Sequence, residues 1–459
     1  MTRGMRTAIT VLLVCCMMSL LIVGCGGNAG QNTESTAGST EAAASTAATT
    51  TGPAMGQTAL GNSGAENDGT TVNFWSLFGG ADGAQMVEML NAYNATNPKV
   101  KISQATQDWD NYYTKLKTSI LGGEAPDLCI SHDVYVWGLI KEGCLTPIDD
   151  EAAKVGVNLD YGNYVQKIED LKYDNHYYAI PVDCLQILFS YNKDIVGKAG
   201  LLDEAGLPKI EAGAESFYKF LDTLKSNTDV APFGTILTTG SVPMYLFNSL
   251  YFQYGGSKPF VSDDGKTWQM DNEIGLKAAE TYQKIASYSL PNIQNLAEIF
   301  VGGKCATALD GAWQMNYFYE QLGASRYGVI KLPQFGPTYK TAVYGHQFVL
   351  PVSSTRSDEK TAGALEFVKW FSENNAMWSK AGSMPAYKPA QDSDLFKKLP
   401  MHKYFQDAPN YSTLLTFTAP FALKGSPEMN EPLGKLARKE VTPQQCLDEM
   451  AQRMGTALK

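Results

Sequence analysis

The chain has 459 residues, of which 44% are hydrophobic, and it carries a formal net charge of −10 with an isoelectric point near 5.1. This acidic balance argues against a nucleic-acid-binding function, because phosphate backbones select basic protein surfaces. The length is sufficient for two domains of ordinary size, and the composition is that of a globular protein.

The first 25 residues have the layout of a secretion signal. Arg3 and Arg6 give a positively charged start, an apolar run extends from Val11 to Val23, and small Gly24 stands directly before Cys25. This layout resembles the lipobox of bacterial lipoproteins, in which the cysteine becomes the lipid-modified first residue. Two alternatives remain: an uncleaved anchor, although the run is shorter than the roughly 20 residues that cross a bilayer, and a plain secretory signal. We predict a signal peptide over residues 1–24 and a lipid anchor at Cys25 that holds the protein on the extracellular face of the bacterial cell membrane.

Residues 26–70 are rich in Ser, Thr, Ala and Gly. They contain no aromatic residue, no Val or Ile, and no Lys or Arg, so nothing in them could offset the entropy of ordering the chain. We therefore predict a disordered tether over residues 25–70, and a folded part that begins near Thr71.

The cysteines do not form a recognisable framework. Past Cys25 there are five, widely spaced and without a C-x-x-C pair: Cys129, Cys144, Cys184, Cys305 and Cys446. Such spacing is typical of neither a disulfide scaffold nor a zinc site, so we interpret most of them as small buried hydrophobic residues. One disulfide among them remains an open alternative, because an exported protein meets oxidising conditions.

Strand and helix patterns alternate along the folded part. In the first half, the spacing of apolar residues predicts strands at 72–75, 100–103 and 127–130, and helices at 86–93, 113–121 and 134–141. In the second half, it predicts strands at 185–191, 307–309 and 347–350, and helices at 214–224, 245–254, 272–287 and 360–371. This alternation favours two α/β lobes, each a mostly parallel sheet flanked by helices. Ligands of such sheets bind beyond the carboxyl ends of strands, here after Trp75, Ser103 and Ile130.

Several short motifs, in order along the folded part, carry a family resemblance. They are Gly122–Leu128 with His132, Asp133 and Trp137; Ala179–Asp183; Tyr191–Asp194; Phe300–Lys304 with Gly311–Trp313; and Gly382–Ala386. Together they resemble the family 1 extracellular solute-binding proteins, the carbohydrate-binding subunits of ABC importers, which include maltose-binding protein. Each motif alone is weak, and their ordered sum is specific.

The resemblance implies a two-lobe periplasmic-binding-protein-like fold of type II, in which the lobes close around a ligand about a hinge. One lobe would hold residues 71–181 and about 345–372, and the other residues 182–344 and about 373–459, with crossovers near 181–183 and 344–347. The implied function is capture of a sugar or oligosaccharide and its delivery to an ABC permease. We expect no enzymatic activity, no cofactor, no metal ion and no nucleic acid, and we expect a monomer.

A sugar site needs aromatic rings for the apolar faces of the ligand and carboxylates or amides for its hydroxyls. Trp75, Phe78, Asp108 and Trp109 qualify because they follow predicted strands. The resemblance adds Asp133 with its neighbour His132, and Asp183, Tyr245 and Trp313. Asp133 could instead cap the helix that begins at Val134, and Trp313 could be a core aromatic residue. Weaker candidates are Asn248, His346 and Tyr387.

Departures from the family pattern keep other functions open. Gly79 and Gly80 stand where maltose-binding protein has a charged pair, and Val134 replaces an arginine, so a maltodextrin ligand does not follow from the resemblance. One alternative is the same fold with a non-sugar ligand, such as a peptide, a polyamine or a phosphodiester. Another is a surface glycoside hydrolase with Asp133 and Asp183 as acid and base. The sequence has no phosphate loop, no G-x-S-x-G and no H-E-x-x-H motif.

Overall fold

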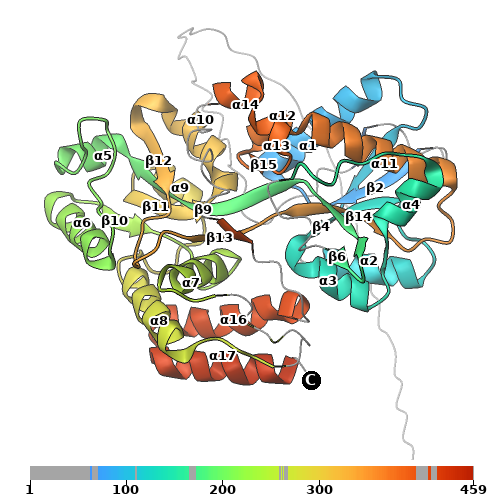
Figure 1. The fold of residues 1–459 in the computed structure, drawn as a ribbon. Helices are drawn as coiled ribbons and strands as arrows, with labels where there is room; N and C mark the ends of the chain where they lie inside the picture. The colour runs from blue at the N-terminus through green and yellow to red at the C-terminus, as the bar shows by residue number, and fades with distance from the viewer. Residues whose placement is uncertain are drawn as a thin grey trace, which may run out of the picture. The chain divides into compact units, whose positions relative to one another are not determined.

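The computed structural model describes residues 62–64, 71–108, 111–164, 172–257, 260, 262, 267–399, 412–414 and 421–457 (Figure 1). The predicted signal peptide, the predicted lipidation site Cys25 and the candidate ligand residue Trp109 lie outside these residues. Two seven-stranded mixed sheets organise the fold, each covered by helices. No helix among the described residues has both the length and the apolar character needed to cross a membrane.

The first sheet has the strand order β1-β3-β2-β4-β14-β5, and β8 also pairs with β14. Its strands are β1 (Asn62–Gly64), β2 (Val72–Ser76), β3 (Ile102–Thr106), β4 (Leu128–His132), β5 (Leu145–Thr146), β8 (Ala179–Pro181) and β14 (His346–Pro351). Its flanking helices are α1 (Gly80–Ala95), α2 (Tyr112–Leu121), α3 (Asp133–Lys141), α4 (Ile148–Val155) and α11 (Asp358–Glu373). The short hairpin β6 (Lys172–Tyr173) and β7 (His176–Tyr177) packs against α4.

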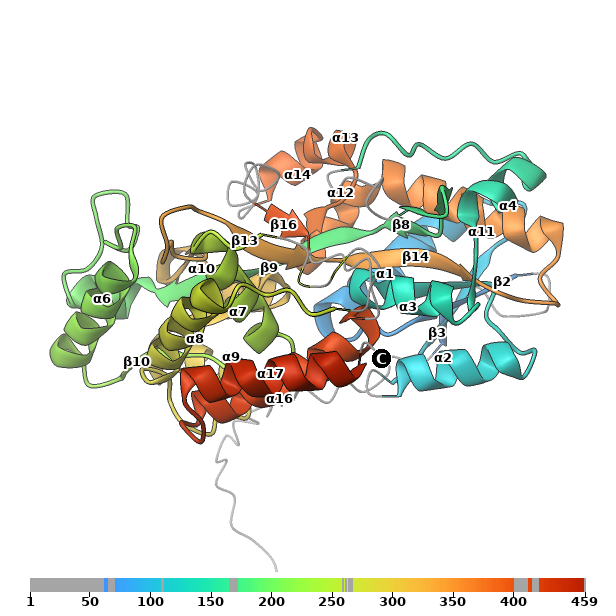
Figure 2. The same ribbon diagram turned by 60° about the horizontal axis from the view of Figure 1, so that its bottom comes forward.

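The second sheet has the order β10-β11-β9-β13-β16, and β12 and β15 also pair with β9. Its strands are β9 (Asp183–Asn192), β10 (Ala231–Gly234), β11 (Cys305–Gly311), β12 (Tyr327–Lys331), β13 (Thr341–Tyr344), β15 (Met384–Pro385) and β16 (Ser412–Leu414). The helices of this half are α5 (Lys193–Lys198), α6 (Ala214–Asn227), α7 (Val242–Gln253), α8 (Asn272–Ala286), α9 (Leu296–Val301), η2 (Ala312–Gln314), α10 (Met315–Arg326), α16 (Phe421–Ala437) and α17 (Pro443–Ala457). Figure 2 shows α16 and α17 side by side, with α17 packed on α8.

The segment after α11 carries four short elements. They are α12 (Asn375–Trp378), η3 (Ser379–Ala381), α13 (Lys388–Gln391) and α14 (Asp394–Lys398). Side chains of this segment enter both cores, since Trp378 packs in the core of the first sheet and Ala376 in a core of the second.

The sheets are mixed, which corrects the prediction that each would be mostly parallel. β2 runs parallel to β3 and β4, but β14 is antiparallel to β4, β5 and β8. In the second sheet β9 is antiparallel to all four strands that pair with it. The reason is the connectivity: β14 and β9 enter their sheets directly from the other sheet and not through a helical crossover, which is the connection that makes neighbours parallel.

The chain passes between the sheets at Val182 and Gly345, within the two segments where crossovers were expected. β8 ends at Pro181 in the first sheet and β9 begins at Asp183 in the second; β13 and β14 flank Gly345 in the same way. The N–H of Val182 donates to the carbonyl of His346 at 2.8 Å, so the crossovers run side by side. A Cβ at Gly345 would collide with the carbonyl oxygen of Asp183, so this close approach requires glycine.

Order begins earlier in the chain than predicted. β1 lies inside the segment predicted to be a tether, where it pairs antiparallel with β3 from Asn62 opposite Ala105 to Gly64 opposite Ser103. A short edge strand is held by backbone hydrogen bonds, so it can form in a segment whose side chains offer no apolar surface.

All five cysteines of the described part are buried, as small apolar residues would be, and they form no disulfide with one another. Burial raises the pKa of the thiols of Cys129, Cys305 and Cys446 to about 12, which keeps them as inert thiols at neutral pH. The disulfide that the sequence left open is therefore absent among these residues.

Candidate functional site

A continuous chain of aromatic rings links the second sheet to the first. In order, and with successive ring centroids 6.4, 4.3, 5.7, 4.9, 4.7 and 4.9 Å apart, its members are Trp313, Tyr245, Tyr344, His132, His346, Phe78 and Trp378. We call this set the ring chain. It joins five of the predicted ligand residues, which come from segments far apart in the sequence.

Strand pairing places the two histidines of the ring chain. His132 ends β4 and His346 begins β14, and these two residues are direct partners in the antiparallel pairing of the strands. Tyr344 ends β13 on the other side of the Gly345 crossover. The centre of the ring chain therefore lies where the two sheets exchange strands.

Asp183 stabilises the crossover region from a fully buried position. This fully buried carboxylate accepts hydrogen bonds from the backbone N–H of His346 at 2.8 Å and from the indole Nε1 of Trp378 at 2.7 Å, and its Oδ2 lies 2.9 Å from His346 Nδ1. Burial is the largest single influence on the pKa of His346 and lowers it, but the nearby carboxyl groups, Asp183 first and then Asp82 and Asp133, together raise the pKa above the ordinary 6.5. The imidazole gives the buried Asp183 carboxylate a partner that it would otherwise lack.

The pKa of His132 is shifted in the opposite direction. Burial lowers the pKa of His132 far below 6.5, and the nearby His346 lowers it further, so the ring is neutral at pH 7. The hydroxyl of Tyr113 accepts the backbone N–H of His132 at 2.8 Å and lies 2.7 Å from its Nδ1. The hydroxyl proton is thus free to be donated to Nδ1, which places the ring proton on Nε2. Tyr135 stacks on Tyr113 with centroids 3.9 Å apart and widens this aromatic surface.

Asp133 is the first residue of α3, and it does not cap that helix from outside. Its Oδ1 accepts the N–H of Val134 at 2.7 Å and its Oδ2 accepts the N–H of Gly345 at 3.1 Å, while its own N–H donates to the carbonyl of Gly345 at 3.0 Å. Both oxygens therefore fasten α3 to the crossover.

Helix α7 supplies polar groups that the protein itself does not satisfy. Tyr245 and Asn248 lie three residues apart, on one face of the helix, and both are fully buried. Within the described residues, neither the Tyr245 hydroxyl nor either polar atom of the Asn248 amide has a hydrogen-bond partner. A buried polar group without a partner costs about 1–3 kcal/mol, so a water molecule or ligand group is expected to complete these bonds.

Trp313 follows β11 in the short helix η2. Its ring is half-buried against the core of the second sheet, and a Cβ at Gly311 would occupy the place of that ring. Trp313 is therefore both a packed residue and a partly accessible ring.

The predicted ligand residues Trp75, Asp108 and Tyr387 have other surroundings. Trp75 is the last residue but one of β2 and has the ammonium group of Lys115 5.1 Å from its ring, and Asp108 accepts hydrogen bonds from the backbone and side chain of Asn111, the N-cap of α2. The Tyr387 hydroxyl donates to Asp160 Oδ2 at 2.8 Å. Only the contact of Asp108 with Asn111 is a local one at a helix start; the other two join distant parts of the chain.

Tyr344 and Trp378 belong to the ring chain but were not predicted from the sequence as ligand residues. Tyr344 ends a short strand whose partners come from other parts of the chain, and Trp378 lies in a four-residue helix. Asp82 was not predicted either. Its position could have suggested it as a candidate, because it lies in the first turn of α1, directly after the loop at the carboxyl end of β2.

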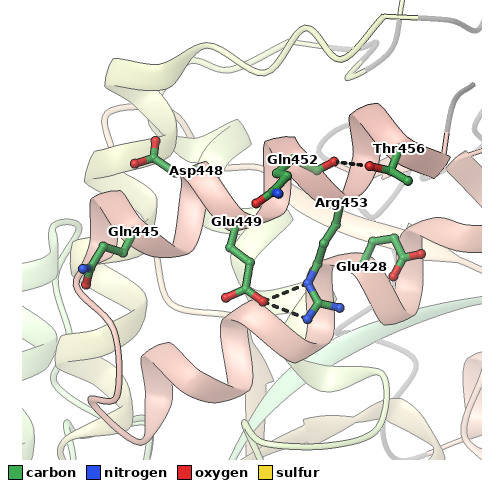
Figure 3. A pocket seen from close by; sticks show the side chains of 7 residues that line it. All are labelled: Glu428, Gln445, Asp448, Glu449, Gln452, Arg453 and Thr456. Carbon is green, nitrogen blue, oxygen red and sulfur yellow. Dashed lines mark hydrogen bonds and ion pairs between the residues drawn. The ribbon is translucent and has the colours of Figure 1, made fainter.

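Two further groups of polar residues lie away from the ring chain. Asp149, Asp150 and His176 have potential metal-ligand atoms within 4.8 Å of one another, and the imidazole Nδ1 lies 3.4 Å from each carboxylate, so the group forms a surface ion-pair cluster. A hollow between α16 and α17 is lined by Glu428, Gln445, Asp448, Glu449, Gln452, Arg453 and Thr456 (Figure 3). There Arg453 pairs with Glu449 at 2.8 Å and with Glu431 at 2.6 Å, so its charges serve to join the two helices.

Comparison with known proteins assigns the family. The profile of the bacterial extracellular solute-binding proteins matches residues 43–378, which is most of the chain. The protein belongs to this family.

The relatives of this solute-binding protein differ in what they bind. The sn-glycerol-3-phosphate-binding periplasmic protein UgpB of Escherichia coli is 24% identical over 438 residues, 88% of this chain and 96% of that protein. The diacetylchitobiose-binding protein DasA of Streptomyces coelicolor is 26% identical over 254 residues, 54% of this chain and 56% of that protein. Among solved structures, the GacH receptor of Streptomyces glaucescens has a TM-score of 0.72 at 18% identity, covering 84% of this chain and 98% of that one. The two-lobe α/β fold is thus shared with sugar-binding receptors.

Proposed function

We propose that this solute-binding protein is a lipid-anchored extracellular receptor that captures a sugar or oligosaccharide at the ring chain, between its two lobes, and delivers it to an ABC permease. The lobes proposed are residues 71–181 with about 345–372, and residues 182–344 with about 373–459. The single observation that carries the proposal is the ring chain with its unsatisfied polar neighbours.

The chemistry of the ring chain suits a polyhydroxylated ligand. A pyranose has apolar C–H faces that pack on aromatic rings, and the half-buried Trp313 offers such a face. The hydroxyls need fixed donors and acceptors, which the Tyr245 hydroxyl and the Asn248 amide can provide without breaking any bond within the protein. Binding would thereby remove the cost of leaving these groups buried and unpaired.

The position of the ring chain at the crossovers supports a closure mechanism. Val182 and Gly345 are the places where the chain passes between sheets, so a small rotation about them would change the distance between Trp313 and Phe78. A ligand that touches both lobes stabilises the closed arrangement by its differential affinity, and a permease can recognise that arrangement.

The lipid anchor is part of the proposal and rests on the sequence. If Cys25 carries the lipid, Cys25→Ala should move the protein from the membrane fraction into the culture medium, while Cys16→Ala, in the same signal segment, should not. Retention of the Cys25 variant on membranes would contradict the anchor.

A second candidate ligand is a glycerophosphate. The similarity to UgpB over 88% of this chain favours it, but the carboxylates Asp133 and Asp183 at the crossover would repel a phosphate. A hydrolase is less well supported, because both carboxylates are occupied by protein donors and neither is placed as an acid with an accessible proton.

The test is a ligand screen on residues 26–459, which retain every residue that the structure describes. Maltotriose, mannobiose, diacetylchitobiose and sn-glycerol 3-phosphate are added separately, and the melting temperature and the fate of the sugar are measured. We expect at least one uncharged sugar to raise the melting temperature by about 2 °C or more and to be recovered intact. Released product would favour the hydrolase, and stabilisation by the phosphate alone would favour the second ligand class.

A further inference from the structure

The carboxyl group of Asp82 has no evident role in stabilising the fold. It lies in the first turn of α1, where acidic residues normally accept backbone N–H bonds of the helix start. The N-cap residue is Gly79, which has no side chain to make a cap bond, and among the described residues Asp82 Oδ1 has no hydrogen-bond partner although this atom is closed off from solvent. Helix capping therefore does not explain why a half-buried carboxyl with one enclosed oxygen stands at this position.

The surroundings of Asp82 connect it to the ring chain. The charges that act on it are those of His346 and Asp183, which are bonded to each other. The groups that face His346 are Asp183, Asp82 and Asp133 by charge and His132 by ring contact at 4.9 Å. The His346 ring also packs on Phe78, in the loop that leads into α1, with centroids 4.7 Å apart. Asp82 thus belongs to the end of the ring chain that the first sheet provides.

We propose that Asp82 is a specificity-determining ligand contact, whose neutral carboxyl group bonds a hydroxyl of an uncharged polyol and whose ionised form repels a phosphate at the same place. This inference rests on the proposed function. The orphaned oxygen is an acceptor that an incoming hydroxyl can satisfy, in the way that the Tyr245 hydroxyl and the Asn248 amide can be satisfied from the second lobe. Asp82 would supply the matching polar contact from the first lobe.

The protonation of Asp82 should make the affinity for the ligand depend on pH. Burial raises the pKa of Asp82 to about 7; the charge of His346 lowers it and that of Asp183 raises it. Closure around an uncharged ligand removes water and favours the neutral carboxyl further, so binding takes up a proton and affinity falls as the pH rises above 7. Over the interval from pH 6 to 8.5, we expect a loss of about three- to tenfold in affinity.

The experiment measures affinity for each screen compound at pH 6, 7 and 8.5 on wild-type protein and on Asp82→Asn and Asp82→Ala. The asparagine variant keeps the shape and a donor but cannot ionise, so its affinity for an uncharged sugar should be independent of pH. The alanine variant should bind about tenfold more weakly at pH 6. Glu88→Gln, on the exposed face of the same helix where Glu88 pairs with Lys380 at 2.6 Å, should behave as wild type.

Each outcome decides between distinct statements. A sugar that binds with the same pH profile in all variants would overturn the role of Asp82 and leave the proposed function intact. Binding of sn-glycerol 3-phosphate at least as tightly as any sugar would overturn the role of Asp82 and favour the second ligand class. Failure of every compound to bind would contradict the proposed function. Independently of any ligand, a carboxyl carbon NMR titration, assigned with Asp82→Asn, should give a midpoint near 7, and a midpoint near 4 would overturn the inference.

Discussion

Individual buried carboxyl groups in this protein are compensated in three different ways. Asp183 has a histidine and an indole as partners, Asp133 has two backbone N–H groups, and Asp82 has an unsatisfied oxygen. The family resemblance predicted a ligand role for the first two. Only the structure distinguishes them from Asp82, because hydrogen-bond partners come from distant segments.

Asp310 is a fourth buried carboxyl, and it makes a prediction about stability. It is the last residue but one of β11, three residues before Trp313, and burial raises its pKa to about 7, partly offset by a bond of 2.7 Å from the Gly311 N–H. Because the native state holds this proton more tightly than the unfolded chain, stability is highest below the unfolded pKa near 4 and falls as the pH rises to 7. The ionisation costs about 2–4 kcal/mol.

Asp310→Asn preserves the acceptor for Gly311 but cannot ionise. Denaturant unfolding between pH 4.5 and 8 should show a flatter pH profile for this variant than for wild type, and greater stability than wild type at pH 8. Asp229→Asn, at an exposed loop position, is the matched control and should follow the wild-type profile. A variant less stable than wild type at pH 8 would show that Asp310 is held ionised by the fold.

At the level of elements, local signals predicted the long helices and the central strands. The helix predicted at 272–287 is α8, at 272–286, and its N-cap Asp271 accepts the N–H of Ile274 as a capping side chain should. The apolar run at 185–191 lies within β9, which is buried along its whole length. Both features depend only on neighbouring residues.

Short elements that depend on distant partners were not predicted. β13 is four residues long and is held between β9 and β16, and β15 is a two-residue pairing with the start of β9. The antiparallel direction of β14 also could not be predicted from the alternation of strands and helices alone, because the direction of a strand depends on where the chain passes from one sheet to the other. The same limit explains why Tyr344 and Trp378 were missed while Trp313 and His132, which lie in recognisable motifs, were found.

At the level of the whole molecule, the two lobes meet in a region rich in aromatic rings. α3 packs against α16, and Val134 enters the core formed mainly by the second lobe. Together with the crossovers at Val182 and Gly345, these contacts couple the lobes directly beside the ring chain. A ligand seated there would alter the contacts of both lobes at once, which is what a receptor that closes on its ligand requires.

The most direct test of this account is a calorimetric titration of the sugar that stabilises the protein best, carried out on wild type and on Trp313→Ala. Loss of the ring should weaken binding by about 10- to 100-fold, since truncating a stacked aromatic anchor costs about 1.4–3 kcal/mol. The control is Trp370→Ala, a half-buried tryptophan on α11 that packs on Tyr93 at 5.5 Å, away from the ring chain. Unchanged affinity in Trp313→Ala, or equal losses in both variants, would contradict the claim that the ring chain binds the solute.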